Sequence, residues 1–165
     1  MRKCALSLLL LSAAALAQTQ YGTAPKTPVP THAQKGCPWL TEGSAAHALG
    51  GDVSVTAKVS DMGEGLCSFA RREGTQDSLD ILVSKASLPT CPPDSTNLRG
   101  IGNEALTCRP RNSHGEAVEM ISSRVRDFHF TVTLITRGQK APVKPDDPQN
   151  DALEQIAEQI AGNLY

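Results

Sequence analysis

The middle of the chain holds the segment Leu98-Arg99-Gly100-Ile101-Gly102-Asn103-Glu104-Ala105, which lies between Cys91 and Cys108. Its two glycines and its alanine match the letters of a dinucleotide-binding fingerprint, which requires a strand directly before it and a full helix directly after it. The preceding residues 91–96 are typical of a loop, and only two residues separate Ala105 from Cys108. The sequence therefore predicts no bound cofactor. We interpret the segment as a tight glycine turn that packs three side chains into a core: Ile101, Ala105 and Leu106.

Strand-like patterns flank this turn on both sides. Residues 52–60 alternate between apolar and polar side chains, which predicts a half-buried strand. Residues 66–71 and 78–85 follow after short turns and complete an antiparallel meander. Residues 116–125 and 128–136 form a predicted hairpin, in which the register of the first strand stays open. The buried side of the first strand is expected to comprise Val53, Val55, Ala57 and Val59.

Two helices complete the predicted fold. Residues 44–49 form a short alanine-rich helix, with Thr41 as its N-cap and Gly50 ending it. Residues 151–164 form an amphipathic helix that begins with a capping box of Asp151 and Glu154. The expected class is α+β, with a single antiparallel sheet of about five strands and the N-terminal short helix and C-terminal amphipathic helix packed on one face.

The N-terminus has the pattern of an export signal. Arg2 and Lys3 precede an apolar run, and Ala15-Leu16-Ala17 is a small-x-small cleavage site. We predict a signal peptide over residues 1–17, removed on export to the periplasm or the medium. The apolar run is too short for a permanent membrane span, so no stable membrane insertion is expected after cleavage.

The remaining chain divides into a tether and a domain. Residues 18–36 are rich in proline and threonine and are expected to be a disordered tether. Residues 37–165 are expected to form a single α+β domain, monomeric, because the apolar stripe of the last helix faces the core.

The charge balance excludes one class of partner. Removing Arg2 and Lys3 from the 16 basic residues leaves 14 against 17 acidic residues, a net charge near −3. A nucleic-acid-binding domain normally carries a basic patch, so no nucleic acid is expected. The expected partner is an unknown protein of the cell envelope or the extracellular space.

Four cysteines remain after the signal peptide: Cys37, Cys67, Cys91 and Cys108. An even number in an exported chain indicates disulfides, with three connectivities to choose from. We favour Cys37–Cys67 and Cys91–Cys108, because each pair flanks a structural unit. A zinc site is the competing interpretation, but the sequence lacks a Cys-x-x-Cys pair. No metal site is therefore predicted.

The sequence favours a role without catalysis. The motifs of serine hydrolases, zinc proteases and nucleotide-binding loops are absent. The nearest approach to a catalytic pair is His129 with Asp127, which would share a strand face with Thr131. We predict a non-catalytic exported binding or accessory domain. The alternative is a small extracytoplasmic hydrolase using His129 and Asp127.

Arginines provide the candidate binding residues. Two pairs are spaced two residues apart, Arg109 with Arg111 and Arg124 with Arg126, so each pair would project to one side of an extended chain. Guanidinium groups suit carboxylate or phosphate recognition, which makes these four an anion-patch hypothesis. The alternative is that they balance carboxylates across neighbouring strands.

The order of several short motifs resembles a known family. The residues that carry the resemblance are Cys37, Leu40, Thr41, Leu49, Gly50, Cys67, Phe69, Gly100, Gly102, Glu104 and Ala105. The chain is similar to the small exported bacterial domains of unknown function common among lipoproteins, which are related in shape to PsbP-like domains. The resemblance spans roughly residues 37–164 and implies an α+β fold with helices against one face of an antiparallel sheet. It implies no catalytic residues, and this chain lacks the lipid-attachment cysteine of many members.

Overall fold

The computed structural model describes residues 36–88, 91–92, 95–110, 116–137 and 148–165, all within the unit Ala33–Tyr165. The predicted signal peptide, the tether up to residue 35 and residues 138–147 lie outside these residues. The elements are α1 (Glu42–Leu49), β1 (Val53–Val59), β2 (Gly65–Arg71), β3 (Ser78–Ser84), β4 (Thr96–Leu98), β5 (Glu104–Cys108), β6 (Ala117–Val125), β7 (Phe128–Thr136) and α2 (Pro148–Leu164).

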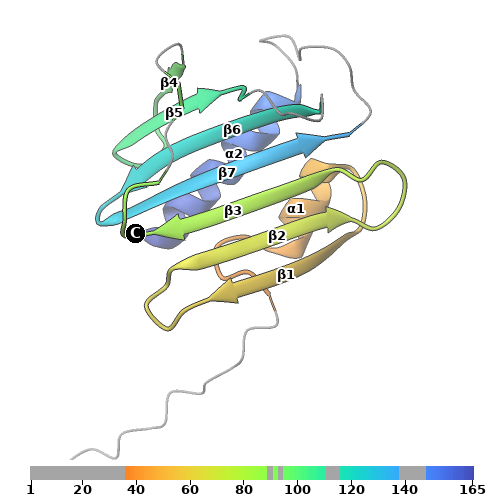
Figure 1. The fold of residues 1–165 in the computed structure, drawn as a ribbon, viewed down its shortest axis with the longest axis horizontal. Coiled ribbons are helices and arrows are strands. Elements are labelled where there is room, and N and C mark those ends of the chain that lie inside the picture. Colours follow the sequence, from red (N-terminus) through yellow and green to blue (C-terminus); the bar gives the residue numbers. More distant parts are fainter. Residues whose placement is uncertain (1–35, 89–90, 93–94, 111–115, 138–147) are drawn as a thin grey trace, which may run out of the picture. The chain divides into compact units, whose positions relative to one another are not determined.

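The strands form one antiparallel sheet in the order β1-β2-β3-β7-β6-β5-β4. The predicted meander is β1-β2-β3 and the predicted hairpin is β6-β7, and the two are joined where β3 pairs with β7. Both helices lie on the same face of the sheet (Figure 1). The α+β class and the single antiparallel sheet are therefore confirmed.

The number of strands was underestimated, because the sheet has seven strands and not about five. The two additional strands, β4 and β5, lie on either side of the glycine turn and pair with each other. They have three and five residues, too few for an alternating pattern to stand out in the sequence. Pairing of β5 with β6 supplies the backbone hydrogen bonds that hold them in the sheet.

The core lies between the sheet and the helices. Phe69, Ile81 and Phe130 are fully buried on the helix-facing side of three central strands, and Trp39 is buried beside them. In β6 the buried positions are Ile121, Ser123 and Val125, which resolves the register that the sequence left open. The helices contribute Ala45, Leu49, Leu153, Ile156, Ala157 and Ile160.

The ends of the helices follow from local chemistry. Thr41 accepts a hydrogen bond from the backbone N–H of Ser44 at 3.1 Å, and Gly50 ends α1 in the left-handed conformation at φ 69°. The predicted start of the second helix is wrong, because α2 begins at Pro148 and Asp151 lies within its first turn. Proline is tolerated at the first turn because the N–H that it lacks would have no helical partner there.

Both predicted disulfides are present. Cys37 and Cys67 have Cα atoms 5.7 Å apart, and Cys91 and Cys108 have Cα atoms 5.6 Å apart. The first ties the segment before α1 to β2. The second ties the connection before β4 to the end of β5, where the Cys91 sulfur also lies 3.7 Å from the carbonyl oxygen of Leu106.

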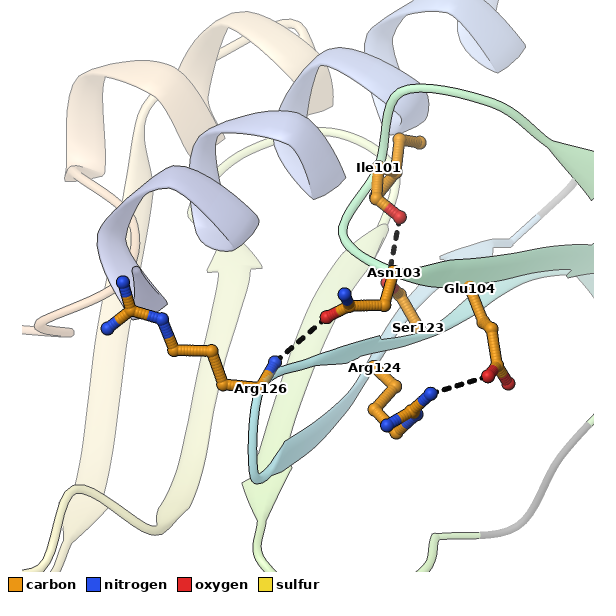
Figure 2. A network of polar contacts seen from close by, with 6 residues as sticks. All are labelled: Ile101, Asn103, Glu104, Ser123, Arg124 and Arg126. Carbon is orange, nitrogen blue, oxygen red and sulfur yellow. Dashed lines mark hydrogen bonds and ion pairs between the residues drawn. The ribbon is translucent and has the colours of Figure 1, made fainter.

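The glycine turn is attached to the end of β6 (Figure 2). A Cβ atom at Gly102 would lie 2.6 Å from the carbonyl oxygen of Arg124, so only glycine allows this close approach. Ser123 Oγ donates to the carbonyl of Ile101 at 3.2 Å, and Asn103 Oδ1 accepts from the backbone N–H of Arg126 at 3.0 Å. Ile101 is buried as predicted, as is Ala105, while Leu106 is only partly buried.

The expected buried face of β1 is largely wrong. Val53 is buried and Val55 is partly buried, but Ala57 and Val59 are exposed. The physical reason is position: β1 is the terminal strand of the sheet, and the helix that covers its first residues does not extend along its whole length. An alternating pattern identifies a strand, but it does not say how much of the apolar side is covered.

Candidate functional site

Two of the four predicted arginines pair with carboxylates in the structure. Arg124 lies 2.5 Å from the carboxylate of Glu104 on the adjoining strand, and Arg109 lies 3.4 Å from that of Glu119. Arg111 lies outside the described residues. These two ion pairs agree with the alternative interpretation, in which the arginines balance carboxylates of neighbouring strands.

Arg126 points away from Arg124 (Figure 2). Its guanidinium carbon lies 5.1 Å from the ring centre of Tyr165, the residue that follows α2. Its backbone adopts a positive φ of 53°, which is unusual for a residue with a side chain and is supported here by the hydrogen bond from its N–H to Asn103. Arg126 therefore links the β6–β7 turn to the C-terminal residue and to the glycine turn.

The structure describes both residues of the predicted catalytic pair, His129 and Asp127. The strand register places His129 beside Ser84 of β3, but the Ser84 hydroxyl donates to the carboxylate of Glu64 at 3.1 Å. Asp127 is exposed in the β6–β7 turn. Within the described part of the chain, no side-chain hydrogen bond joins His129 to either residue. The described residues also contain no cluster of three histidine, cysteine or carboxylate side chains that could hold a metal ion.

A hollow of about 300 Å³ lies between the two helices. Its lining combines small and polar side chains of α1, such as Ser44 and His47, with Gln155 and Gln159 of α2. Ligand pockets usually combine an apolar lining with a few convergent polar groups. Its lining also includes the apolar Ala48, Ala152 and Ile156, but four of its eight residues are polar, so we do not place the functional site there.

The outer edge of β1 is the strongest candidate for a binding surface. Two backbone hydrogen bonds, from Arg72 N to Asp52 O at 2.9 Å and from Ser60 N to Glu64 O at 2.8 Å, flank the β1–β2 ladder. Because hydrogen-bonded pairs alternate along an antiparallel ladder, the even-numbered residues of β1 point their backbone groups toward β2. The odd-numbered residues Val55, Ala57 and Val59 therefore point their N–H and C=O groups outward. We call these three residues the β1 edge.

Within the described part of the chain, no strand pairs with the β1 edge. Its N-terminal limit is set by Arg72, whose Nε donates to the carbonyl oxygen of Val53 at 2.8 Å. Lys58 projects between Ala57 and Val59 on the sheet face opposite the helices, and no described carboxylate forms an ion pair with it. The β1 edge thus offers unpaired backbone groups beside one lysine.

Exposed apolar side chains lie on both faces of the sheet near this edge. Val59 is on the helix side of β1, and Leu66 lies opposite Lys58 on the other face. Among the described residues, the exposed large hydrophobic side chains are Val59 at 37%, Met62 at 66%, Leu66 at 40% and Tyr165 at 59%. The β1–β2 turn, the β6–β7 turn and the C-terminus all lie at one end of the sheet (Figure 1). We call these four residues the apolar end. It meets the β1 edge at Val59.

Glu64 holds the β1–β2 turn against the end of β3. Its carboxylate accepts the backbone N–H of Lys85 at 2.6 Å and the hydroxyl of Ser84 at 3.1 Å. These hydrogen bonds favour the charged carboxylate and therefore lower the pKa of Glu64 below its ordinary value. The bond from the Lys85 backbone makes the largest contribution. The turn that presents Met62 is therefore fixed by polar contacts at its base.

The sequence prediction did not identify the β1 edge as a site. The only signal was Met62, an apolar residue within a predicted turn, where polar residues normally lie. No family model, curated protein or solved structure matches this chain.

Proposed function

We propose that this chain is a non-catalytic, exported binding domain that contacts its partner through the β1 edge and the apolar end. The observation that supports it most directly is the coincidence of unpaired backbone groups and exposed apolar side chains at Val59. An unpaired edge strand with exposed apolar side chains is a template for pairing with another chain. A monomeric domain with no other role would normally protect a long edge strand.

Export is supported by independent features. The N-terminal residues follow the pattern of a signal peptide, and two disulfides suit an oxidising compartment outside the cytoplasm. Membership of the family of small exported bacterial domains is part of the same proposal, carried by the motifs quoted above. The test is to fuse residues 1–36 to a reporter that is active only after export. Activity should depend on the apolar residues 5–16, and the mature N-terminus should be Gln18.

Binding through the apolar end can be tested by site-specific photo-crosslinking. A photoreactive phenylalanine replaces Met62 in one variant and the exposed His47 of α1 in a matched control, and each is irradiated with the envelope fraction of its source. The variant at position 62 should yield a defined adduct by mass spectrometry, and the control should not. The adduct should disappear when Val59→Ser and Leu66→Ser are added. Adducts of equal yield at both positions would argue against this binding surface.

A further inference from the structure

We propose that the β1 edge accepts an extended segment of another protein as an added antiparallel strand, with a carboxylate side chain opposite Lys58. This inference rests on the proposed function, because it names the kind of partner that the binding surface takes. Strand addition draws affinity from backbone hydrogen bonds and specificity from alternate side chains.

The geometry of the β1 edge defines the pattern of the added strand. Partner residues opposite Val55, Ala57 and Val59 form the hydrogen-bonded pairs, and their side chains lie on the helix side, next to an apolar row. Partner residues opposite Thr56 and Lys58 lie on the other side of the sheet. Antiparallel pairing continues the pattern of the sheet and is slightly more stable for each residue than parallel pairing. Read from its N-terminus, the partner segment is apolar, acidic, apolar, Ser or Thr, apolar.

Charge accounts for the acidic position. Lys58 is exposed at the edge, and in the described part of the chain it has no ion-pair partner. A carboxylate directly opposite a lysine stabilises a strand pair, whereas a second positive charge destabilises it.

A second copy of this chain fits the edge less well. Arg72 already donates a hydrogen bond to the carbonyl oxygen of Val53. Symmetric antiparallel pairing of β1 from two copies keeps this hydrogen bond if it is centred on Ala57. That register places the Lys58 side chains of the two copies diagonally across from each other, within reach of repulsion. A register centred on Thr56 avoids the repulsion but pairs Val53 with Val59 of the other copy, which displaces Arg72. The chain's own residues 18–35 contain no alternating apolar run that would match the edge.

The test uses the mature disulfide-bonded chain and the peptide Ser-Thr-Val-Glu-Val-Thr-Val-Thr-Ser. Amide hydrogen exchange is followed residue by residue by NMR. With peptide at ten times its Kd, exchange at Val55, Ala57 and Val59 should slow about ten-fold, because only the free fraction exchanges. The amides of Thr56 and Lys58 point toward β2 and should change little.

Two variants separate the roles of charge and backbone. A peptide with Lys in place of Glu should bind the wild-type chain about five-fold more weakly, and Lys58→Glu should reverse that preference. Ala57→Pro removes an outward N–H without breaking the β1–β2 ladder, so it should abolish binding of both peptides. An unchanged thermal midpoint would show that Ala57→Pro is folded. If it is not, the Lys58→Glu reversal still decides the question.

Several results would overturn the inference. Equal affinity for both peptides, or no peptide-dependent protection of the odd-numbered amides, would exclude an acidic strand on this edge. Protection without peptide that grows with protein concentration would identify a second copy as the occupant, and protection independent of concentration would identify a segment of the same chain. If the crosslink from position 62 still forms in these cases, the proposed binding function stands without strand addition.

Discussion

The two edge strands of the sheet differ in length, in attachment and in what they expose. β4 has three residues and follows a segment that the Cys91–Cys108 disulfide ties to the neighbouring strand β5. β1 has seven residues, and among the described residues only Arg72 covers its outer backbone groups, at Val53. Short edge strands are a common protection against unwanted pairing, and β4 has it whereas β1 does not.

This difference shows where the molecule concentrates its stability and where it leaves a surface available. The region of β4 and β5 is held by a disulfide, a glycine approach and hydrogen bonds from Ser123 and Asn103. The far half of β1 is held to β2 by the ladder, and its apolar side chains remain exposed. The first region is built for rigidity, and we propose that the second is built for contact.

Removing the disulfides should have the largest effect on stability. The Cys37–Cys67 disulfide closes a loop with a sequence separation of 30 residues. On the loop-entropy model, replacing both cysteines by alanine should lower the free energy of unfolding by about 4 kcal/mol. The corresponding pair Cys91→Ala with Cys108→Ala spans 17 residues and should lower it by about 3 kcal/mol. Urea unfolding measures both. A larger loss at Cys91 and Cys108 would mean that the β4 side depends on its disulfide more than chain entropy predicts.

Substitution of a glycine in the glycine turn should have the second-largest effect on stability. Gly102→Ala places a Cβ 2.6 Å from the Arg124 carbonyl oxygen and at a positive φ of 61°, so it should destabilise by about 2–3 kcal/mol. Gly100→Ala is the matched control, because its φ of 89° is strained but no atom lies within 4 Å of the added Cβ. It should lose only about 1 kcal/mol. If thermal unfolding shows equal losses of stability for the two variants, the requirement for glycine comes from backbone conformation and not from close packing on β6.

Gly65 offers the equivalent test on the β1 side. A Cβ there would lie 2.1 Å from the Lys58 carbonyl oxygen, so Gly65→Ala must push β1 away from β2. An edge strand can move outward, and we therefore expect a local loss of about 1–2 kcal/mol. Hydrogen exchange should accelerate at Thr56 and Lys58 while the amides of β6 and β7 remain protected. Acceleration across the whole sheet would show that β1 and the core unfold as one unit.

The smallest expected effect concerns the pH dependence of the β1–β2 turn. Because the pKa of Glu64 is lower in the folded state, its carboxylate stabilises the fold above the ordinary glutamate pKa of about 4.3, and this contribution is lost as pH falls through the lower folded value. Glu64→Gln should therefore be less stable than the wild type at neutral pH and equally stable in strong acid. Asp61→Asn, in the same turn and exposed, is the control for charge alone. If the difference in stability between Glu64→Gln and the wild type persists in strong acid, it comes from the packing or geometry of the side chain and not from its charge.

The fold class was predictable because local patterns reported it. The predicted strands 66–71, 78–85 and 128–136 are present as β2, β3 and β7, with Phe69, Ile81 and Phe130 buried at their centres. The strands β4 and β5 were missed because they are too short to carry a pattern and exist through pairing with β6. The arginine hypothesis depended on spacing alone, and the positive φ at Arg126 sent that side chain away from Arg124.

The amino-acid sequence was sufficient to predict the strands of the meander and the hairpin, the position and caps of α1, and the two cysteine pairs. These features depend on residues close together in the chain or on chemistry particular to one residue type. Which strand lies at the edge of the sheet, and which of its faces is covered, depends on long-range packing. The order of strands is set by long-range pairing, and an alternating sequence such as Val53–Val59 looks the same whether a neighbour covers it or not. The candidate site arises from that order, and for this reason it could not be identified from the residues of β1 alone.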